Sequence, residues 1–124
     1  MPEGEVPMTC GDDVKVAVAK ALMRYATEGE RRDGFIVIEY KENVAEWRSG
    51  EVRYVAKVVR YPTVEMDSPD GKVRAEFWLR RNGEVVFGCW LDFYPGTPPG
   101  YYFNCHGKEC PKGAIEEGLR LLGL

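Results

Sequence analysis

The feature that most constrains this chain is a hairpin between residues 75 and 93, AEFWLRRNGEVVFGCWLDF. Alternate residues of a strand point to opposite faces of a sheet. One face of the first strand carries Ala75, Phe77 and Leu79, and alternate residues from 85 to 93 give the second strand a matching apolar face. We expect both faces to lie together in the core, because separating them would expose several large side chains at about 1.5–3 kcal/mol each.

The turn of this hairpin has two alternatives. Asn82-Gly83 as a two-residue turn is the strongest short hairpin signal, but with a regular ladder it puts Phe77 and Phe87 on opposite faces. A three-residue loop, Arg81-Asn82-Gly83, with its glycine in the left-handed conformation and a bulge, shifts the pairing by one residue. Since Phe77 then faces Phe87, we predict the three-residue loop.

The second face of the hairpin carries two tryptophans among charged residues. The predicted register gives this face ten residues: Lys72, Arg74, Glu76, Trp78, Arg80, Val86, Gly88, Trp90, Asp92 and Tyr94. Arg74 falls opposite Trp90, which suits a cation–π contact, and Gly88 leaves a gap where a flat group could approach. A preceding strand over residues 51–61 adds five more: Arg53, Val55, Lys57, Val59 and Tyr61.

The rest of the chain predicts an α+β fold. Helical spacing of apolar residues indicates a helix over about 11–28 and a last helix that begins at Cys110-Pro111. The other expected strands cover residues 34–40, 44–48 and 101–104, with Ser49-Gly50 as a turn that pairs Glu46 with Arg53. We therefore expect an N-terminal helix, a curved antiparallel sheet of four or five strands and a C-terminal helix. Residues 1–10 form a loose leader, and residues 11–124 form one domain.

Charge and composition limit the functions that the chain can have. The net charge of −3 excludes a uniformly basic nucleic-acid binder, although basic residues dominate from Arg48 to Arg81 and allow a local basic patch. Glutamine is absent and serine occurs twice, which together with abundant charge is typical of hyperthermophiles. No apolar run reaches the roughly 18 residues of a membrane helix, and the N-terminus lacks the features of a secretory signal, so we expect a cytoplasmic protein.

The second face predicts binding of single-stranded DNA or RNA without catalysis, cofactor, metal or small-molecule substrate. Aromatic rings stack on bases at about 1–3 kcal/mol each, and cations hold the phosphates. The expected binding residues combine both kinds: Arg53, Lys57, Tyr61, Lys72, Arg74, Trp78, Arg80, Trp90 and Tyr94. Two alternatives stay open, because the same face could join a homodimer or a partner protein, or a helix of the chain could cover it.

An aromatic sheet face rimmed by Arg and Lys, in a domain of hyperthermophile composition, resembles the ThermoDBP family. These are single-stranded DNA-binding proteins of hyperthermophilic archaea, and the family has shorter relatives. The resemblance is architectural and covers about residues 11–124. It implies an apolar cleft for the bases and flanking basic residues for the phosphates, with no individual position carried over.

The four cysteines predict disulfides, which hyperthermophiles form even inside the cell. We expect Cys105–Cys110 to close the turn before the last helix and Cys10–Cys89 to tie the first helix to the sheet, although four cysteines allow three pairings. Zinc is disfavoured because the spacing lacks paired knuckles. A Cys–His hydrolase that uses Cys10 and His106, the only histidine, is a distant third function.

Overall fold

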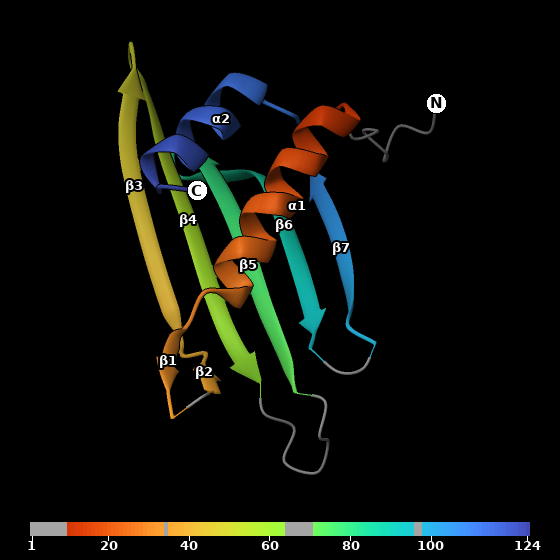
Figure 1. The fold of residues 1–124 in the computed structure, drawn as a ribbon. Coiled ribbons are helices and arrows are strands. Elements are labelled where there is room, and N and C mark those ends of the chain that lie inside the picture. Colours follow the sequence, from red (N-terminus) through yellow and green to blue (C-terminus); the bar gives the residue numbers. More distant parts are fainter. Residues whose placement is uncertain (1–9, 34, 64–70, 96–97) are drawn as a thin grey trace.

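Two helices lie on one side of a five-stranded antiparallel sheet in the computed structural model, which describes residues 10–33, 35–63, 71–95 and 98–124 (Figure 1). In chain order the elements are α1 (Asp12–Thr27), β1 (Glu30–Arg32), β2 (Phe35–Val37), β3 (Lys41–Ser49), β4 (Val52–Thr63), β5 (Lys72–Arg81), β6 (Glu84–Tyr94), β7 (Gly100–Gly107) and α2 (Lys112–Leu121). The strands of the large sheet are ordered β3-β4-β5-β6-β7. This arrangement confirms the predicted α+β fold; residues 1–9 of the expected leader lie outside the described residues.

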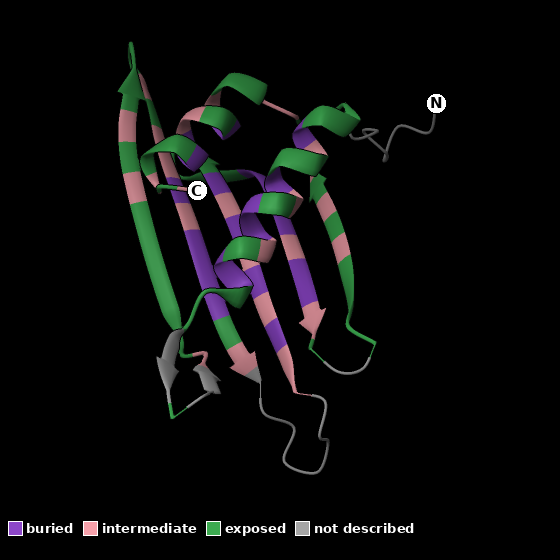
Figure 2. Cartoon of the chain, viewed as in Figure 1, coloured by how far each residue is buried: buried purple, intermediate pink, exposed green. Residues whose placement is uncertain are grey.

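The core lies between the helices and the middle of the sheet (Figure 2). Helix α1 packs against β5 and β6 through residues such as Val18 and Leu22, and α2 packs against β4. Gly118 of α2 permits a close approach, because a Cβ there would lie 2.9 Å from the Cβ of Ala56. The apolar stripe predicted for α1 from helical spacing is buried except at Ala17, which is exposed. The strand that carries Phe35–Val37 pairs with β1 in a separate two-stranded sheet.

The central hairpin buries both apolar faces together, as predicted, but by another route. Arg81 pairs with Glu84, so Asn82-Gly83 is a two-residue turn, and both residues have positive φ, 49° and 83°. The ladder then shifts between Leu79 and Arg80, which brings Leu79 opposite Phe87. The predicted three-residue loop is wrong because a bulge inside β6 takes up the extra residue and returns the apolar residues of both strands to the same face. The Asn-Gly turn preference and core burial are therefore both satisfied.

The turn between β3 and β4 also differs from the prediction. Ser49 pairs with Val52, so the turn residues are Gly50 and Glu51 instead of Ser49-Gly50. Gly50 has φ 63°, a left-handed value that glycine adopts without steric cost, which favours it at the first turn position. Arg53 consequently lies opposite Arg48.

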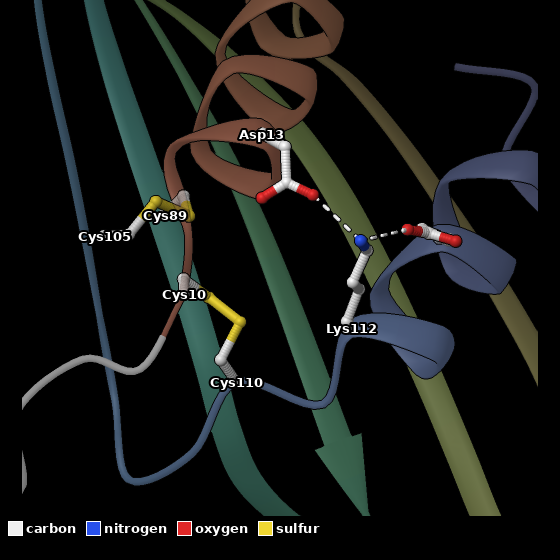
Figure 3. Close-up of a disulfide and its surroundings, with 7 residues drawn as sticks. Cys10, Asp13, Cys89, Cys105, Cys110 and Lys112 are labelled. Carbon is white, nitrogen blue, oxygen red and sulfur yellow. Dashed lines mark hydrogen bonds and ion pairs between the residues drawn. A yellow bond between two sulfur atoms is a disulfide. The ribbon is translucent and has the colours of Figure 1, made fainter.

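Both disulfides form, but neither has the predicted partners (Figure 3). Cys89 and Cys105 are directly opposite in β6 and β7, with 4.0 Å between their Cα atoms. Cys10, which is buried just before α1, bonds Cys110, just before α2, and an ion pair of 2.8 Å between Asp13 and Lys112 lies beside this bond. The pairing predicted between Cys105 and Cys110 fails because β7 extends to Gly107 and carries Cys105 into the ladder.

A buried arginine holds the C-terminal end of α1. Arg60 is 5% exposed and lies on the helix-facing side of β4. Its guanidinium donates hydrogen bonds to the carbonyl oxygens of Glu39 (2.7 Å), Tyr25 (3.0 Å) and Glu28. The last carbonyls of a helix lack partners within it, and a cation there also suits the helix dipole, so Arg60 fixes where the helix ends.

Candidate nucleic-acid interface

The face of the large sheet that points away from α1 and α2 is the candidate site. Both helices lie on the opposite side, and no helix of the described residues covers this face (Figure 1). We call it the outer face, and the strand registers define it as alternate residues 42–48 of β3, 53–61 of β4, 72–80 of β5, 88–94 of β6 and 100–106 of β7.

All nine residues predicted to bind nucleic acid lie on the outer face. The set is Arg53, Lys57, Tyr61, Lys72, Arg74, Trp78, Arg80, Trp90 and Tyr94. The registers bring Lys57 beside Trp78 and Tyr61 beside Arg74. They separate Arg53 and Lys72, which lie toward opposite ends of the sheet. The face therefore has a turn end, near the β3–β4 and β5–β6 turns, and a far end near Lys72.

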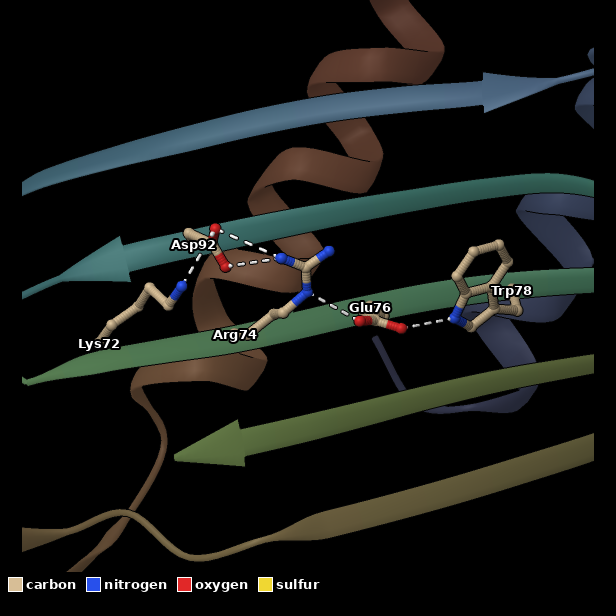
Figure 4. Close-up of polar contacts among 5 residues, drawn as sticks. All are labelled: Lys72, Arg74, Glu76, Trp78 and Asp92. Carbon is tan, nitrogen blue, oxygen red and sulfur yellow. Dashed lines mark hydrogen bonds and ion pairs between the residues drawn. The ribbon is translucent and has the colours of Figure 1, made fainter. Parts of the chain in front are cut away.

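Trp78 lies flat on the outer face. Its ring covers Gly88, since a Cβ at that glycine would come within 2.4 Å of the six-membered ring, and the ring's edge meets His106 with 5.8 Å between centroids. The indole Nε1 donates a hydrogen bond of 2.9 Å to Glu76. Seen from the outer side, the indole is face-on (Figure 4). The gap predicted at Gly88 is thus filled by Trp78, which presents one fixed aromatic face outward.

A small concavity adjoins this indole at the turn end. It has a volume of about 280 Å³ and is lined by Lys57, Trp78, Arg80 and Val85. Arg80 is exposed, and among the described residues no carboxylate forms an ion pair with it. An aromatic face and two cations therefore border one hollow.

Trp90 is covered by an arginine, in contrast to Trp78. The guanidinium carbon of Arg74 lies 4.8 Å from the centroid of the Trp90 ring, so the predicted cation–π contact is confirmed. The predicted cross-strand pairing is wrong: the bulge places Arg74 opposite Asp92 and Glu76 opposite Trp90. The contact is therefore diagonal, and a guanidinium occupies one side of this ring.

Carboxylates neutralise much of the basic charge that the sequence predicted. Arg74 forms ion pairs with Glu76 (2.8 Å) and Asp92 (3.4 Å), and Lys72 approaches Asp92 at 3.7 Å (Figure 4). Asp92 is only 7% exposed, so its charge is held inside this network. We call Lys72, Arg74, Glu76 and Asp92 the ion-pair lattice.

Two further carboxylates of β3 pair with predicted phosphate ligands. Glu46 lies 3.2 Å from Arg53, and Glu42 lies 3.4 Å from Lys57. The hydroxyl of Tyr40 donates to Glu42 (2.6 Å), and this bond together with Lys57 lowers the pKa of that carboxyl. The same bond raises the pKa of Tyr40 to about 12. The sequence predicted that Glu46 and Arg53 are neighbours, although the observed register places Arg48 opposite Arg53. It missed Glu42 because the expected strand began only at residue 44.

Tyrosines lie at the far end of the outer face. Tyr94 meets Tyr102 edge-to-face with 5.9 Å between ring centroids, and Tyr102 is 66% exposed. With Pro98, Gly100 and Tyr101 they line a hollow of about 560 Å³. Tyr102 was absent from the predicted set because the expected strand over residues 101–104 had no register. Its exposed ring adds a stacking group to this end.

Other chemistry has little support in the described residues. No group of three or more His, Cys, Asp or Glu side chains in residues 10–33, 35–63, 71–95 and 98–124 is arranged to hold a metal ion. All four cysteines are in disulfides, so the thiol that a Cys–His mechanism needs is absent in this state. Within the same ranges, neither helix is long and apolar enough to cross a membrane.

Comparison of the chain with protein-family models, with curated proteins and with solved structures finds no match. The resemblance to the ThermoDBP family therefore stays a prediction, and the candidate function depends on the geometry of the outer face.

Proposed function

We propose that this protein binds single-stranded DNA or RNA on the outer face, with little dependence on base sequence and without catalysis. The observation that carries the proposal is the partly exposed indole of Trp78, which lines one hollow together with Lys57 and Arg80. Stacking on a fixed ring requires no particular base, because every base has a π-face. Nearby cations are what the phosphates of a single strand require.

The fold supports this proposal in a second way. A ring that is already held by Glu76, Gly88 and His106 loses little freedom when a base stacks on it. Tyr61 is 37% exposed and lies on the same face, so a further base of a longer oligonucleotide can stack on its ring.

Titration with a labelled oligothymidine tests the proposal. At low salt it should quench tryptophan fluorescence, and the affinity should fall as salt rises. Replacing Trp78 and Trp90 together by Ala should weaken binding at least tenfold, since stacking contributes about 1–3 kcal/mol per base. The absence of binding at low salt would refute the proposal, and undiminished binding by the double variant would reject the outer face as the site.

One observation favours a second candidate, a homodimer or partner-protein module that uses the same face. The ion-pair lattice leaves the centre of the face close to neutral, and a face with tryptophan, arginine and few free charges is also suited to a protein interface. Light scattering separates the two candidates. A dimer that dissociates when Trp78 is replaced by Arg, in a protein with no affinity for oligothymidine, would favour the interaction module.

A further inference from the structure

We propose that the turn end of the outer face is the principal contact for the ligand, with one base on Trp78 and its adjoining phosphate between Arg80 and Lys57. This inference rests on the proposed function and narrows it. The ligand class is a base joined to a phosphate, as in one nucleotide unit of a single strand. The far end, with Lys72 and Arg74, contributes little to phosphate binding.

The first argument is the state of the cations. A cation that already has carboxylate partners must give up those interactions to bind phosphate, and it releases fewer counterions from the nucleic acid. Arg74 has two such partners, and Lys72 approaches one of them. Arg80 forms no ion pair among the described residues and stays exposed. It is thus the cation of the hairpin that is most available to an anion.

The second argument is the state of the rings. The guanidinium of Arg74 lies over the ring of Trp90, so a base there would compete with a contact that already exists. The ring of Trp78 has its inner side on Gly88, while the residue stays partly exposed and lines the hollow at the turn end. A base can therefore stack on Trp78 without displacing a side chain.

The third argument is the shape between these groups. The hollow lined by Lys57, Trp78, Arg80 and Val85 has a volume of about 280 Å³. Small-molecule pockets usually span about 300–1,000 Å³, so this hollow suits a single base-and-phosphate unit better than a larger ligand. Lys57 is opposite Trp78 in the ladder, and Arg80 lies two residues beyond it on the same face. One ligand unit can reach all three groups.

The salt dependence of the binding constant shows how many phosphates the protein neutralises. For single strands, the logarithm of the binding constant falls with the logarithm of salt concentration by about 0.7 for each phosphate neutralised. Contacts from Arg80 and Lys57 alone predict a slope of about −1.4, which is reached only if Lys57 leaves its ion pair of 3.4 Å with Glu42. If all five basic residues that the sequence suggested made contacts, the slope would be about −3.5.

The experiment measures anisotropy of fluorescein-labelled oligothymidine of eight nucleotides over a range of sodium chloride concentrations. Arg80→Gln should lower the affinity several-fold and make the slope shallower by about 0.7. Lys72→Gln removes one positive charge from the ion-pair lattice and should have a smaller effect on the affinity and on the slope. Lys20→Gln, on the exposed side of α1, is the matched control for net charge. Arg80→Lys should restore most of the slope, which a loss of folding would not allow.

The outcomes separate this inference from the proposed function. Binding with a slope near −1.4 that depends on Arg80 supports both. Binding with a slope near −3.5, or binding that Lys72→Gln weakens more than Arg80→Gln, overturns the inference and leaves the proposed function standing. No binding at low salt overturns both. Displacement of the oligonucleotide by polyglutamate as readily as by unlabelled oligothymidine would point to an acidic protein partner and also overturn the inference.

Discussion

Breaking the disulfide between Cys10 and Cys110 should destabilise the protein more than breaking the disulfide between Cys89 and Cys105. The first bond spans 100 residues of sequence and the second spans 16. A cross-link restricts the unfolded chain more when its loop is longer, which gives about 4.7 kcal/mol for the long loop and about 3 kcal/mol for the short one. The expected difference between the two bonds is therefore about 1.7 kcal/mol.

The assay compares each bond in its oxidised and reduced states, so that the side chains stay the same. In the Cys89→Ala, Cys105→Ala variant only the long loop remains, and in the Cys10→Ala, Cys110→Ala variant only the short one. Guanidinium unfolding with and without reductant gives the free energy lost from each bond. A larger loss in the variant that keeps Cys89 and Cys105 would refute the loop-length reasoning, and a failure of both variants to form a disulfide would refute the connectivity.

Three further predictions concern single residues. Arg60→Met should lower the free energy of unfolding by at least about 3 kcal/mol, since the carbonyl oxygens at the end of α1 lose their donor; thermal unfolding measures this, and a loss under 1 kcal/mol contradicts it. Gly88→Ala should cost about 1–3 kcal/mol and shift tryptophan emission, because the added Cβ would lie 2.4 Å from the Trp78 ring; an unchanged spectrum argues against this contact. Tyr40 should ionise near pH 12, two units above its ordinary value of 10.0, so its bond to Glu42 adds stability below about pH 10 that is lost as pH rises through about 12. Burial also raises the pKa of Tyr25, so ultraviolet titration should show more than one late tyrosine. Glu42→Gln should return Tyr40 toward normal, and no change in this variant contradicts the assignment.

The elements of the fold follow from local patterns in the sequence. The stripe that includes Val18 and Leu22 recurs with helical spacing, and alternation in β5 and β6 assigns each residue a face. Burial of Phe77 together with Phe87 was predictable because it requires only that two apolar faces share one core. The bulge that achieves it was not, since a bulge can take up the extra residue at several positions along a strand.

The disulfides depended on registers that local patterns do not determine. Cys105 meets Cys89 only in the register that pairs Tyr94 with Gly100, and alternation along the chain does not determine that register. Cys10 meets Cys110 only when both helices lie on the same face of the sheet. Pairings across a fold require the tertiary arrangement, which the spacing of the cysteines does not contain.

The residues of the candidate site were predictable, but their partners were only partly so. Alternation along β5 places Glu76 on the same face as Arg74 and Trp78, so its interactions could have been anticipated from the sequence. The position of Asp92 opposite Arg74 follows from the bulge and could not. A face that looks basic in the sequence is therefore largely neutral in its centre, and the exposed Arg80 at its turn end gains importance.

The most direct test of the open outer face uses the indole N–H signals of the three tryptophans in a ¹H–¹⁵N correlation spectrum. Trp78 and Trp90 are on the outer face, whereas Trp47 is on the helix side of β3, beside Gly118 of α2, and serves as an internal control. During titration with oligothymidine at low salt, the Trp78 signal should shift most, the Trp90 signal less and the Trp47 signal not at all. Shifts at Trp47 with an unmoved Trp78, or no shift at any of the three, would contradict the account.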